Sequence, residues 1–239
     1  MDINEFKQTF KVECKKNNIK FDEQKSEKLY EYMKLILEWN EKINLTAIKD
    51  EKMFIVKHFI DSLTVNNFLD NAQNLLDIGT GAGFPGIPLK IYNPDINITL
   101  IDAVNKKIMV LNDIINKLEL QNIEALHIRA EDLAKDLNYR ESFDVVTTRA
   151  VSNFSTISEY MLPFVKIDGK AICMKGPNVE EELEYAKNPI KILGGTIEKV
   201  EKFNINNEFE RNLVVIKKVK QTDKKYPRGQ GKPSKEPLK

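Results

Sequence analysis

The residues with the clearest chemical role lie in one glycine-rich segment, residues 74–91, which reads NLLDIGTGAGFPGIPLKI. A short apolar stretch there ends in an acidic residue and runs into Gly79, Gly81, Gly83 and Gly86. Because glycine has no Cβ, it permits positive φ angles and lets the backbone approach a bound molecule closely. One strand-to-helix turn needs fewer glycines than these. The segment therefore predicts a ligand-binding loop.

The same loop satisfies a dinucleotide-binding pattern. Gly81, Gly83 and Gly86 match G-x-G-x-x-G, and Asp102 follows Gly81 by 21 residues. At that spacing a carboxylate can accept hydrogen bonds from the hydroxyls of a ribose. An NAD-dependent oxidoreductase is therefore one interpretation of this loop.

Three other loop residues favour a different ligand. A pyrophosphate is held by free N–H groups at a helix N-terminus, but Pro85 and Pro88 have no N–H and the phenyl ring of Phe84 offers none. S-adenosylmethionine contains an adenosine and an amino-acid tail but no pyrophosphate, so this loop suits it better. The carboxylate of Asp77, just before the first glycine, would suit its ammonium group, directly or through water.

A second acidic segment follows the third apolar strand. Ala130 and Glu131 stand there beside Asp132, where a backbone turn and a carboxylate could meet the edge of an adenine. The same residues are also typical of an ordinary helix start, because acidic side chains stabilise the first turn of a helix. Both interpretations remain open on these residues alone.

The residues at the end of the fourth expected strand limit the range of possible substrates. In an open parallel sheet the reacting molecule lies beyond the carboxyl ends of the strands, and this strand ends in TTRAV, residues 147–151. It has no Asn/Asp-Pro-Pro-aromatic run, which cradles exocyclic amines, and the chain has no Pro-Cys nucleophile motif for attack at C5 of a pyrimidine. Both common base-methylation chemistries are therefore disfavoured.

A ring nitrogen such as guanine N7 fits this shortage of catalytic groups. It has a free lone pair and no proton, so methyl transfer needs alignment and desolvation more than a general base. The product is cationic, and a bare cation against the ring would oppose the reaction. We therefore expect no general base, and we expect Arg149 and Lys175 to bind a phosphate or a carboxylate.

The elements that position these residues follow from hydrophobic periodicity. Up to about residue 70 the pattern is helical, with one apolar stripe at Leu29, Met33 and Ile36 and a second within residues 51–69. Beyond it, strands alternate with helices, which predicts a mainly parallel sheet with helices on both faces. The expected strands are 74–78, 97–101, 123–128, 143–148, 170–174, 196–203 and 211–219, and the expected helices are 106–118, 154–162 and 178–188. The last two strands should form a hairpin, so that one strand runs antiparallel.

Composition indicates a globular, cytoplasmic protein without a metal centre. The chain has 239 residues, 41% of them hydrophobic and 31% charged, and neither an apolar signal core nor a run of the roughly 20 apolar residues that a membrane span needs. Cys14 and Cys173 are expected to be reduced structural thiols, because neither lies in a CxxC. With only two histidines, His58 and His127, a histidine-based metal site is not expected.

The C-terminal segment differs from the rest of the chain in charge. From Lys217 onward there are nine basic and two acidic residues, a net charge of +7, so the remainder carries −6. Such a segment is either a solvated terminus or an arm that binds a polyanion. The prolines and glycines of its last stretch, KYPRGQGKPSKEPLK, predict no regular structure.

Taken together, these motifs resemble the bacterial 16S rRNA guanine-N7 methyltransferases, also called the glucose-inhibited division protein B family. The resemblance covers nearly the whole chain through HFIDSL at 58–63, DIGTGAGFPGIPL from 77, Asp102, RAE at 129–131, TTRAV from 147, MKG at 174–176 and YPR at 226–228. It implies a class I, Rossmann-like methyltransferase fold. It also implies methyl transfer from S-adenosylmethionine to N7 of one guanine, nucleotide 527 in the 530 loop of 16S rRNA.

The resemblance also assigns roles by position. It implies cofactor contacts at Gly79, Phe84, Ala130, Glu131 and Arg149, with Asp102 at the ribose. It favours an active-site wall at His58, Asp61 and Ser62, which share a helical face, and RNA-side roles for Arg149, Lys175, Tyr226 and Arg228.

The organisation it implies is a helical extension (1–70) packed on a methyltransferase core (71–220), then a basic tail (221–239). The expected partner is 16S rRNA, the small ribosomal subunit or an assembly intermediate of it, and no membrane. A non-catalytic RNA-binding or assembly factor on the same fold is a further alternative, motivated by the basic tail.

Overall fold

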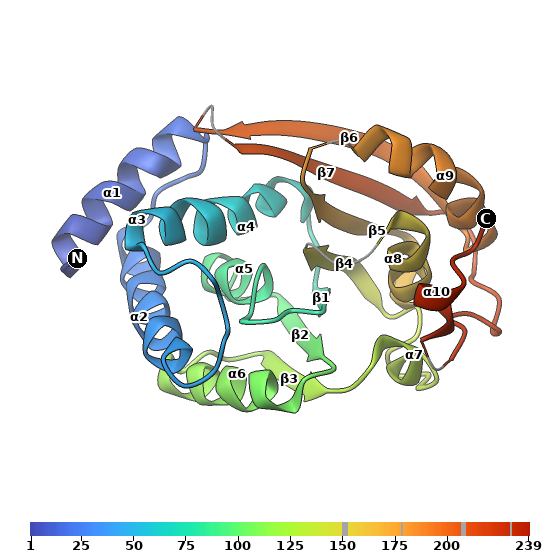
Figure 1. The fold of residues 1–239 in the computed structure, drawn as a ribbon, viewed down its shortest axis with the longest axis horizontal. Coiled ribbons are helices and arrows are strands. Elements are labelled where there is room, and N and C mark those ends of the chain that lie inside the picture. The colour runs from blue at the N-terminus through green and yellow to red at the C-terminus, as the bar shows by residue number, and fades with distance from the viewer. Residues whose placement is uncertain (150–152, 178, 207–208, 230) are drawn as a thin grey trace.

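The computed structural model describes residues 1–149, 153–177, 179–206, 209–229 and 231–239. Its centre is a seven-stranded sheet in the order β3-β2-β1-β4-β5-β7-β6 (Figure 1). The five parallel strands are β1 (Asn74–Ile78), β2 (Asn97–Asp102), β3 (Ile123–His127), β4 (Phe143–Arg149) and β5 (Val165–Lys175). The antiparallel strand β7 (Phe209–Lys218) lies between β5 and β6 (Gly195–Ile205). The expected mainly parallel sheet and the terminal hairpin are both confirmed.

The central strands are apolar on both faces because helices cover both sides. Leu75 of β1 and Val145 of β4 belong to one hydrophobic cluster, whereas their neighbours Leu76 and Val146 belong to the other. Side chains alternate between the two faces of a strand. A strand buried on both faces therefore reads as a continuous apolar run, which is the pattern the sequence shows here.

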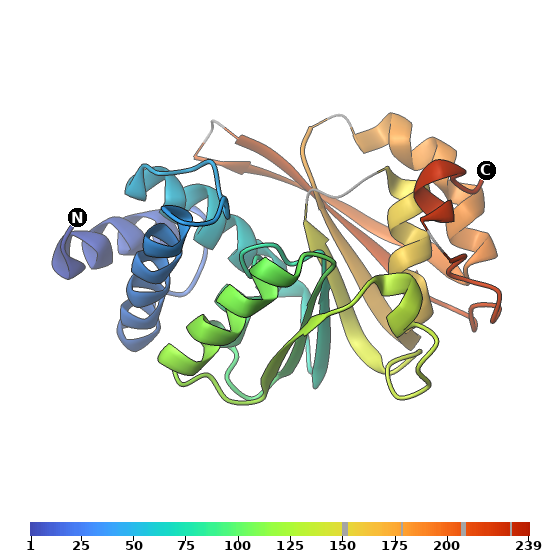
Figure 2. The same cartoon turned by 60° about the horizontal axis from the view of Figure 1, so that its bottom comes forward.

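Two sets of helices form the two outer layers (Figure 2). One face carries α5 (Gly86–Tyr92) and α6 (Asn105–Lys117), and the other carries α7 (Ala130–Leu133), α8 (Phe154–Met161) and α9 (Val179–Ile192). The helix expected at 178–188 extends to Ile192 past Pro189, because Ile190 is buried in the core beneath it.

The N-terminal extension shares a hydrophobic cluster with α5 and α6. Its two long helices are α1 (Ile3–Lys16) and α2 (Glu23–Asn40), each begun by an aspartate whose side chain accepts backbone N–H groups. The phenol of Tyr32, on α2, donates a hydrogen bond of 2.5 Å to the carbonyl of Ala82 in the glycine loop. The extension therefore contacts the predicted binding loop directly.

The segment expected as one helix at 51–69 is divided into four short pieces. It comprises α3 (Glu51–Phe54), a π-helical turn (Ile55–Ile60), α4 (Asp61–Leu63) and a 3₁₀ turn (Thr64–Phe68). A π-helical turn inserts an extra residue into the helical repeat and re-aims the side chains that follow it, and such turns are frequent at functional sites. His58 lies within this turn.

The C-terminal segment is packed on the core beside α8 and α9 (Figure 1). It contains a short helix, α10 (Lys232–Lys235), so the expectation that this stretch lacks regular structure is wrong there. Thr156 on α8 donates a hydrogen bond of 2.8 Å to the carbonyl of Pro233, and the buried side chain of Pro233 fixes the helix on the core. Among the described residues, no helix combines the length and apolar character needed to cross a bilayer.

Candidate active site

The glycine loop between β1 and α5 uses its glycines in two ways. Gly79, Gly81 and Gly83 have φ angles of +68°, +63° and +98°, which favour glycine. A Cβ on Gly81 would come no closer than 4.0 Å to its nearest neighbour, so that side of the loop is open. A Cβ on Gly86, by contrast, would lie 2.2 Å from Leu100 Cδ2. A Cβ on Gly83 would lie 2.7 Å from both Tyr32 Oη and Ile87 Cδ1. The expectation that all four glycines make room for a ligand is therefore wrong at Gly83 and Gly86, where the missing Cβ allows close packing within the protein.

The backbone N–H groups of the loop are largely consumed inside the protein. Residues of the loop, of β1 and of β2 accept the N–H groups of Gly79, Thr80, Gly81, Gly83, Phe84, Gly86 and Ile87. A pyrophosphate site needs several such donors pointing at the ligand. This loop is consequently poorly suited to bind a dinucleotide. Its internally bonded N–H groups are a second argument against a pyrophosphate, in addition to the prolines.

Two carboxylates hold the loop in shape. Asp77 is fully buried and accepts hydrogen bonds from Thr80 Oγ1 at 2.7 Å and from the N–H of Gly86 at 3.0 Å. Burial raises its pKa to about 6 despite these hydrogen bonds. Asp77 therefore stabilises the loop conformation from inside the core. Its burial does not support the direct contact with a ligand ammonium group that its position in the sequence suggested.

Asp102, at the end of β2, also holds the glycine loop in place. Its two oxygens accept the N–H groups of Gly81 at 3.0 Å and Val104 at 2.9 Å, and Lys107 Nζ lies 3.5 Å from Oδ2. The carboxylate that the sequence places at a ribose thus also fixes the open part of the glycine loop.

Phe84 joins the loop to the N-terminal extension and to β4. Its ring stacks on the imidazole of His58, with centroids 4.3 Å apart and planes 8° from parallel, and the guanidinium carbon of Arg149 lies 4.8 Å from its centroid. Tyr32 and Phe54 pack around the same ring. This aromatic cluster is where β1, β4 and the extension meet.

The contacts of His58 fix its protonation state. Its Nδ1 lies 3.2 Å from Arg149 Nη2 and its Nε2 lies 2.8 Å from Thr46 Oγ1. Because a guanidinium can only donate, Nδ1 must accept, and the single proton of the neutral ring lies on Nε2. Burial and the neighbouring cations Arg149 and Lys57 lower the pKa of His58 to about 3. His58 is therefore a neutral hydrogen-bond acceptor at physiological pH.

Asp61 links two arginines that are far apart in the sequence. Its Oδ2 lies 3.3 Å from Arg149 Nη1, its Oδ1 lies 3.2 Å from Arg211 Nε, and the carboxyl group is almost fully buried. Burial raises the pKa of Asp61, although both guanidiniums oppose that shift. Ser62, the third residue of the expected wall, is buried, and its hydroxyl has no hydrogen-bond partner in the described part of the chain.

The sequence did not single out Arg211, because no local pattern distinguishes it from other surface arginines. It lies near the start of β7, and only the pairing of β7 with the carboxyl end of β5, where Lys175 faces Asn212, brings it to the site. Nor does a local pattern mark Thr46, in the loop after α2. For Arg211, the nearest indication in the sequence was its place at the start of the strand expected at 211–219.

The chain is similar to known proteins over nearly its whole length. The family model for rRNA small subunit methyltransferase G matches residues 25–214. Proteins of that name from Clostridium kluyveri and Clostridium botulinum are 47% and 48% identical to this chain, over 94% and 98% of its length and over 95% and 100% of theirs. The chain belongs to the rRNA small subunit methyltransferase G family.

Several solved structures share the fold of this rRNA small subunit methyltransferase G family member. One of them, M. jannaschii TYW2 in complex with AdoMet, has a TM-score of 0.50 and 16% identity over 61% of this chain and 69% of its own. At such identity the likeness shows the fold alone. The expected Rossmann-like methyltransferase fold is confirmed by it and by the sheet order.

The cofactor contacts that the family resemblance implies lie along four adjacent strands. Gly79 and Phe84 follow β1, Asp102 ends β2, the Ala130–Glu131 pair follows β3, and Arg149 ends β4. These strands are neighbours in the order β3-β2-β1-β4. The sheet therefore brings all the expected cofactor residues to one edge, although Ala150 and Val151 of the TTRAV motif lie outside the described residues.

Glu131 has a partner that the sequence did not suggest. Its side chain is buried, and its Oε1 accepts the backbone N–H of Gly231, 100 residues further along the chain, at 3.1 Å. Burial and the Glu131 carboxylate raise the pKa of the nearby Tyr160 phenol to about 12. One face of this family member's expected adenosine pocket is thus in contact with its C-terminal segment.

The RNA-side candidates of this family member have intramolecular partners. Lys175 Nζ forms an ion pair of 2.8 Å with Glu182 and lies 5.0 Å from the ring of Phe154. Tyr226 is buried, and Arg228 forms a bidentate ion pair with the buried Glu159. The basic tail is therefore neither a free terminus nor, at Tyr226 and Arg228, an exposed arm.

Both cysteines are free and buried, as expected for structural thiols. Within the described residues, no group of three or more His, Cys, Asp or Glu side chains is placed to hold a metal ion.

Proposed function

We propose that this protein transfers a methyl group from S-adenosylmethionine to N7 of a guanine in the 530 loop of 16S rRNA. Family membership carries the coarser part of this statement: the chain is an S-adenosylmethionine-dependent rRNA methyltransferase. The finer part, N7 of one guanine, is supported by the chemistry of the site.

Gly79, Phe84, Asp102, Ala130, Glu131 and Arg149 would hold the cofactor at the carboxyl edge of the sheet. Gly81 leaves the loop open to a ligand, while the consumed N–H groups of the loop disfavour a pyrophosphate. These two observations support S-adenosylmethionine over NAD. When bound, the cofactor supplies an electrophilic methyl group on a sulfonium.

The state of His58 is the observation that most supports attack by a ring nitrogen. The Nδ1 lone pair of His58, which a general base would use, accepts a hydrogen bond from Arg149. The pKa of His58 is lowered to about 3. Asp77 is enclosed by the loop. Neither group can accept a proton from a substrate, whereas guanine N7 has no proton to lose. Alignment and desolvation then suffice for the transfer.

Charge pairing around Arg149 suits a cationic product. Methylation at N7 leaves the guanine positively charged, and an uncompensated arginine nearby would raise the energy of that product. Asp61 offsets the charge of Arg149 at 3.3 Å. Arg211, whose side chain is 28% exposed, adds a second guanidinium that can donate to an RNA phosphate.

The RNA backbone would bind the basic C-terminal surface. Its exposed lysines are Lys220, Lys224, Lys225, Lys232, Lys235 and Lys239. Lysines on a surface neutralise phosphates without reading sequence, so their loss weakens binding and flattens its salt dependence. The partner is 16S rRNA, the small ribosomal subunit or an assembly intermediate.

The test is incubation with methyl-labelled cofactor and unmethylated small-subunit RNA or particles, followed by mapping of the labelled nucleotide. We expect label at N7 of a guanine in the 530 loop. Label at another position would refute the assignment of the target. Binding of S-adenosylhomocysteine without transfer to RNA or particles at any assembly state would indicate a non-catalytic binding factor instead.

A further inference from the structure

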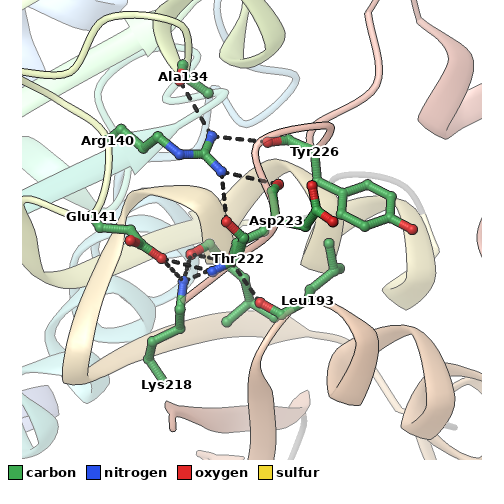
Figure 3. A network of polar contacts seen from close by, with 9 residues as sticks. Ala134, Arg140, Glu141, Leu193, Lys218, Thr222, Asp223 and Tyr226 are labelled. Carbon is green, nitrogen blue, oxygen red and sulfur yellow. Dashed lines mark hydrogen bonds and ion pairs between the residues drawn. The ribbon is translucent and has the colours of Figure 1, made fainter. Parts of the chain in front are cut away.

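The C-terminal segment is attached to the core by buried polar contacts that begin at β7. Lys218 is fully buried and contacts the Glu141 carboxylate at 2.9 Å and Thr222 Oγ1 at 2.7 Å. Arg140 donates to the carbonyls of Thr222, Asp223 and Tyr226 at 2.9, 3.1 and 2.9 Å (Figure 3). These contacts hold the chain as it leaves the sheet and direct it toward α7 and α8.

A second anchor follows at Arg228. Its Nε and Nη2 lie 2.9 and 2.7 Å from the two oxygens of Glu159, and its backbone N–H donates to the same carboxylate at 2.7 Å. Glu159 lies on α8 and is fully buried. A bidentate arginine–carboxylate pair fixes the direction as well as the position of the guanidinium. A surface arm that served only to bind RNA would not need this buried ion pair.

Between this anchor and the contact of α10 with α8, the segment reaches the expected adenosine pocket. The N–H of Gly231 donates to Glu131 Oε1 at 3.1 Å, and Gly231 has a φ of +70°, which favours glycine. On its other side, Thr156 binds the carbonyl of Pro233. Gly231 is thus held from both directions while it contacts a carboxylate that the family resemblance places at the cofactor.

We propose that Arg228 is a positioning residue for the cofactor. Paired with Glu159, it holds the tail so that the Gly231 N–H fixes the Glu131 carboxylate at the adenosine end of S-adenosylmethionine. This inference rests on the proposed function, because it takes the position of the cofactor from it. The exposed lysines of the same tail face solvent, so one segment contributes to the cofactor pocket from its inner side and to RNA binding from its outer side.

Thermodynamic linkage makes the proposal reciprocal. If the docked tail raises cofactor affinity by some factor, then bound cofactor must stabilise the docked tail by the same factor. Cofactor binding should therefore protect the tail from cleavage at its exposed lysines, among them Lys224 and Lys225. A tail that served only RNA binding would show no such protection.

The test compares three variants of the full chain by calorimetry with S-adenosylhomocysteine. Arg228→Gln breaks the anchor but leaves Glu159 as a buried, unpaired carboxylate. The double variant Glu159→Gln with Arg228→Gln replaces both charges with amides and so remains foldable. Lys187→Gln, which removes an exposed ion pair with Glu184 on α9, is the matched control.

We expect the Kd for S-adenosylhomocysteine to rise about tenfold in both Arg228 variants and to stay unchanged in the control. The KM for S-adenosylmethionine should rise in parallel, while kcat at saturating cofactor is retained. S-adenosylhomocysteine should slow tryptic cleavage of the tail in the unsubstituted chain, and less so in Arg228→Gln.

An unchanged Kd in a folded double variant would overturn the proposal and leave the proposed function intact. The same holds if S-adenosylhomocysteine gives the unsubstituted tail no protection from trypsin. If the unsubstituted chain does not bind S-adenosylhomocysteine at all, the proposed function fails first and the inference falls with it.

Discussion

The protonation state of His58 predicts a measurable pH dependence of stability. Its pKa is lowered from 6.5 to about 3, mainly by burial and then by the nearby Arg149 and Lys57. The unfolded chain therefore takes up a proton on His58 as the pH falls below about 6.5, whereas the folded chain does not. This residue stabilises the fold fully above pH 6.5, and that stability is lost progressively between pH 6.5 and 3.

The size of the effect follows from the two pKa values. At pH 5 the unfolded imidazole is almost fully protonated and the folded one is still neutral, so the free energy of unfolding falls by about 2 kcal/mol relative to pH 7. Asp77 acts in the opposite direction, because its pKa is raised to about 6 and the folded chain takes up that proton first. Its contribution is present in any His58 variant and cancels in a comparison.

The variant to compare is His58→Gln, whose amide can accept from Arg149 but does not titrate. Urea unfolding can be followed by the fluorescence of Trp39, the only tryptophan. We expect the variant to be less stable at pH 7, because it loses the stacking on Phe84, and the gap to narrow by about 2 kcal/mol at pH 5.

A gap of constant size from pH 7 to pH 5 would refute the reasoning. A second measurement is NMR of the His58 imidazole. Its ring signals should not move between pH 7.5 and 5.

Three further substitutions test the loop and the tail by urea unfolding. Gly86→Ala places a Cβ 2.2 Å from Leu100 Cδ2 and should destabilise the fold by about 1–3 kcal/mol; an unchanged midpoint would contradict the close packing. Tyr32→Phe removes a 2.5 Å hydrogen bond to a loop carbonyl and should cost about 1–2 kcal/mol; no loss would mean that the contact is dispensable. Lys218→Met leaves Glu141 unpaired and should cost about 3 kcal/mol, partly restored by Glu141→Gln; a loss that the second change deepens would refute the pairing.

Much of the fold is determined by local sequence. The apolar run before Asp77, the glycines after it and the helical periodicity of the first 70 residues each depend on neighbours a few positions apart. Strand alternation and short connections then limit the topology to few choices. The mainly parallel sheet, the antiparallel strand of the final hairpin and the methyltransferase fold followed correctly from these signals.

The partners of the charged residues needed the tertiary structure. The sequence singled out Asp61 and Arg228, but it did not pair Asp61 with Arg211, 150 residues away, or Arg228 with Glu159, 69 residues away. Such pairs depend on which strands are neighbours and on where a tail docks, and neither leaves a periodic pattern.

The sequence by itself therefore determined most of the residues that gather at the carboxyl edge of the sheet, but not Arg211 or Thr46. Only the tertiary structure decided their state: His58 neutral, Asp77 enclosed, and Arg228 turned inward toward Glu159. The physical reason is that burial and the surrounding charges set the protonation and availability of a side chain, and both are properties of the packed chain rather than of its order of residues.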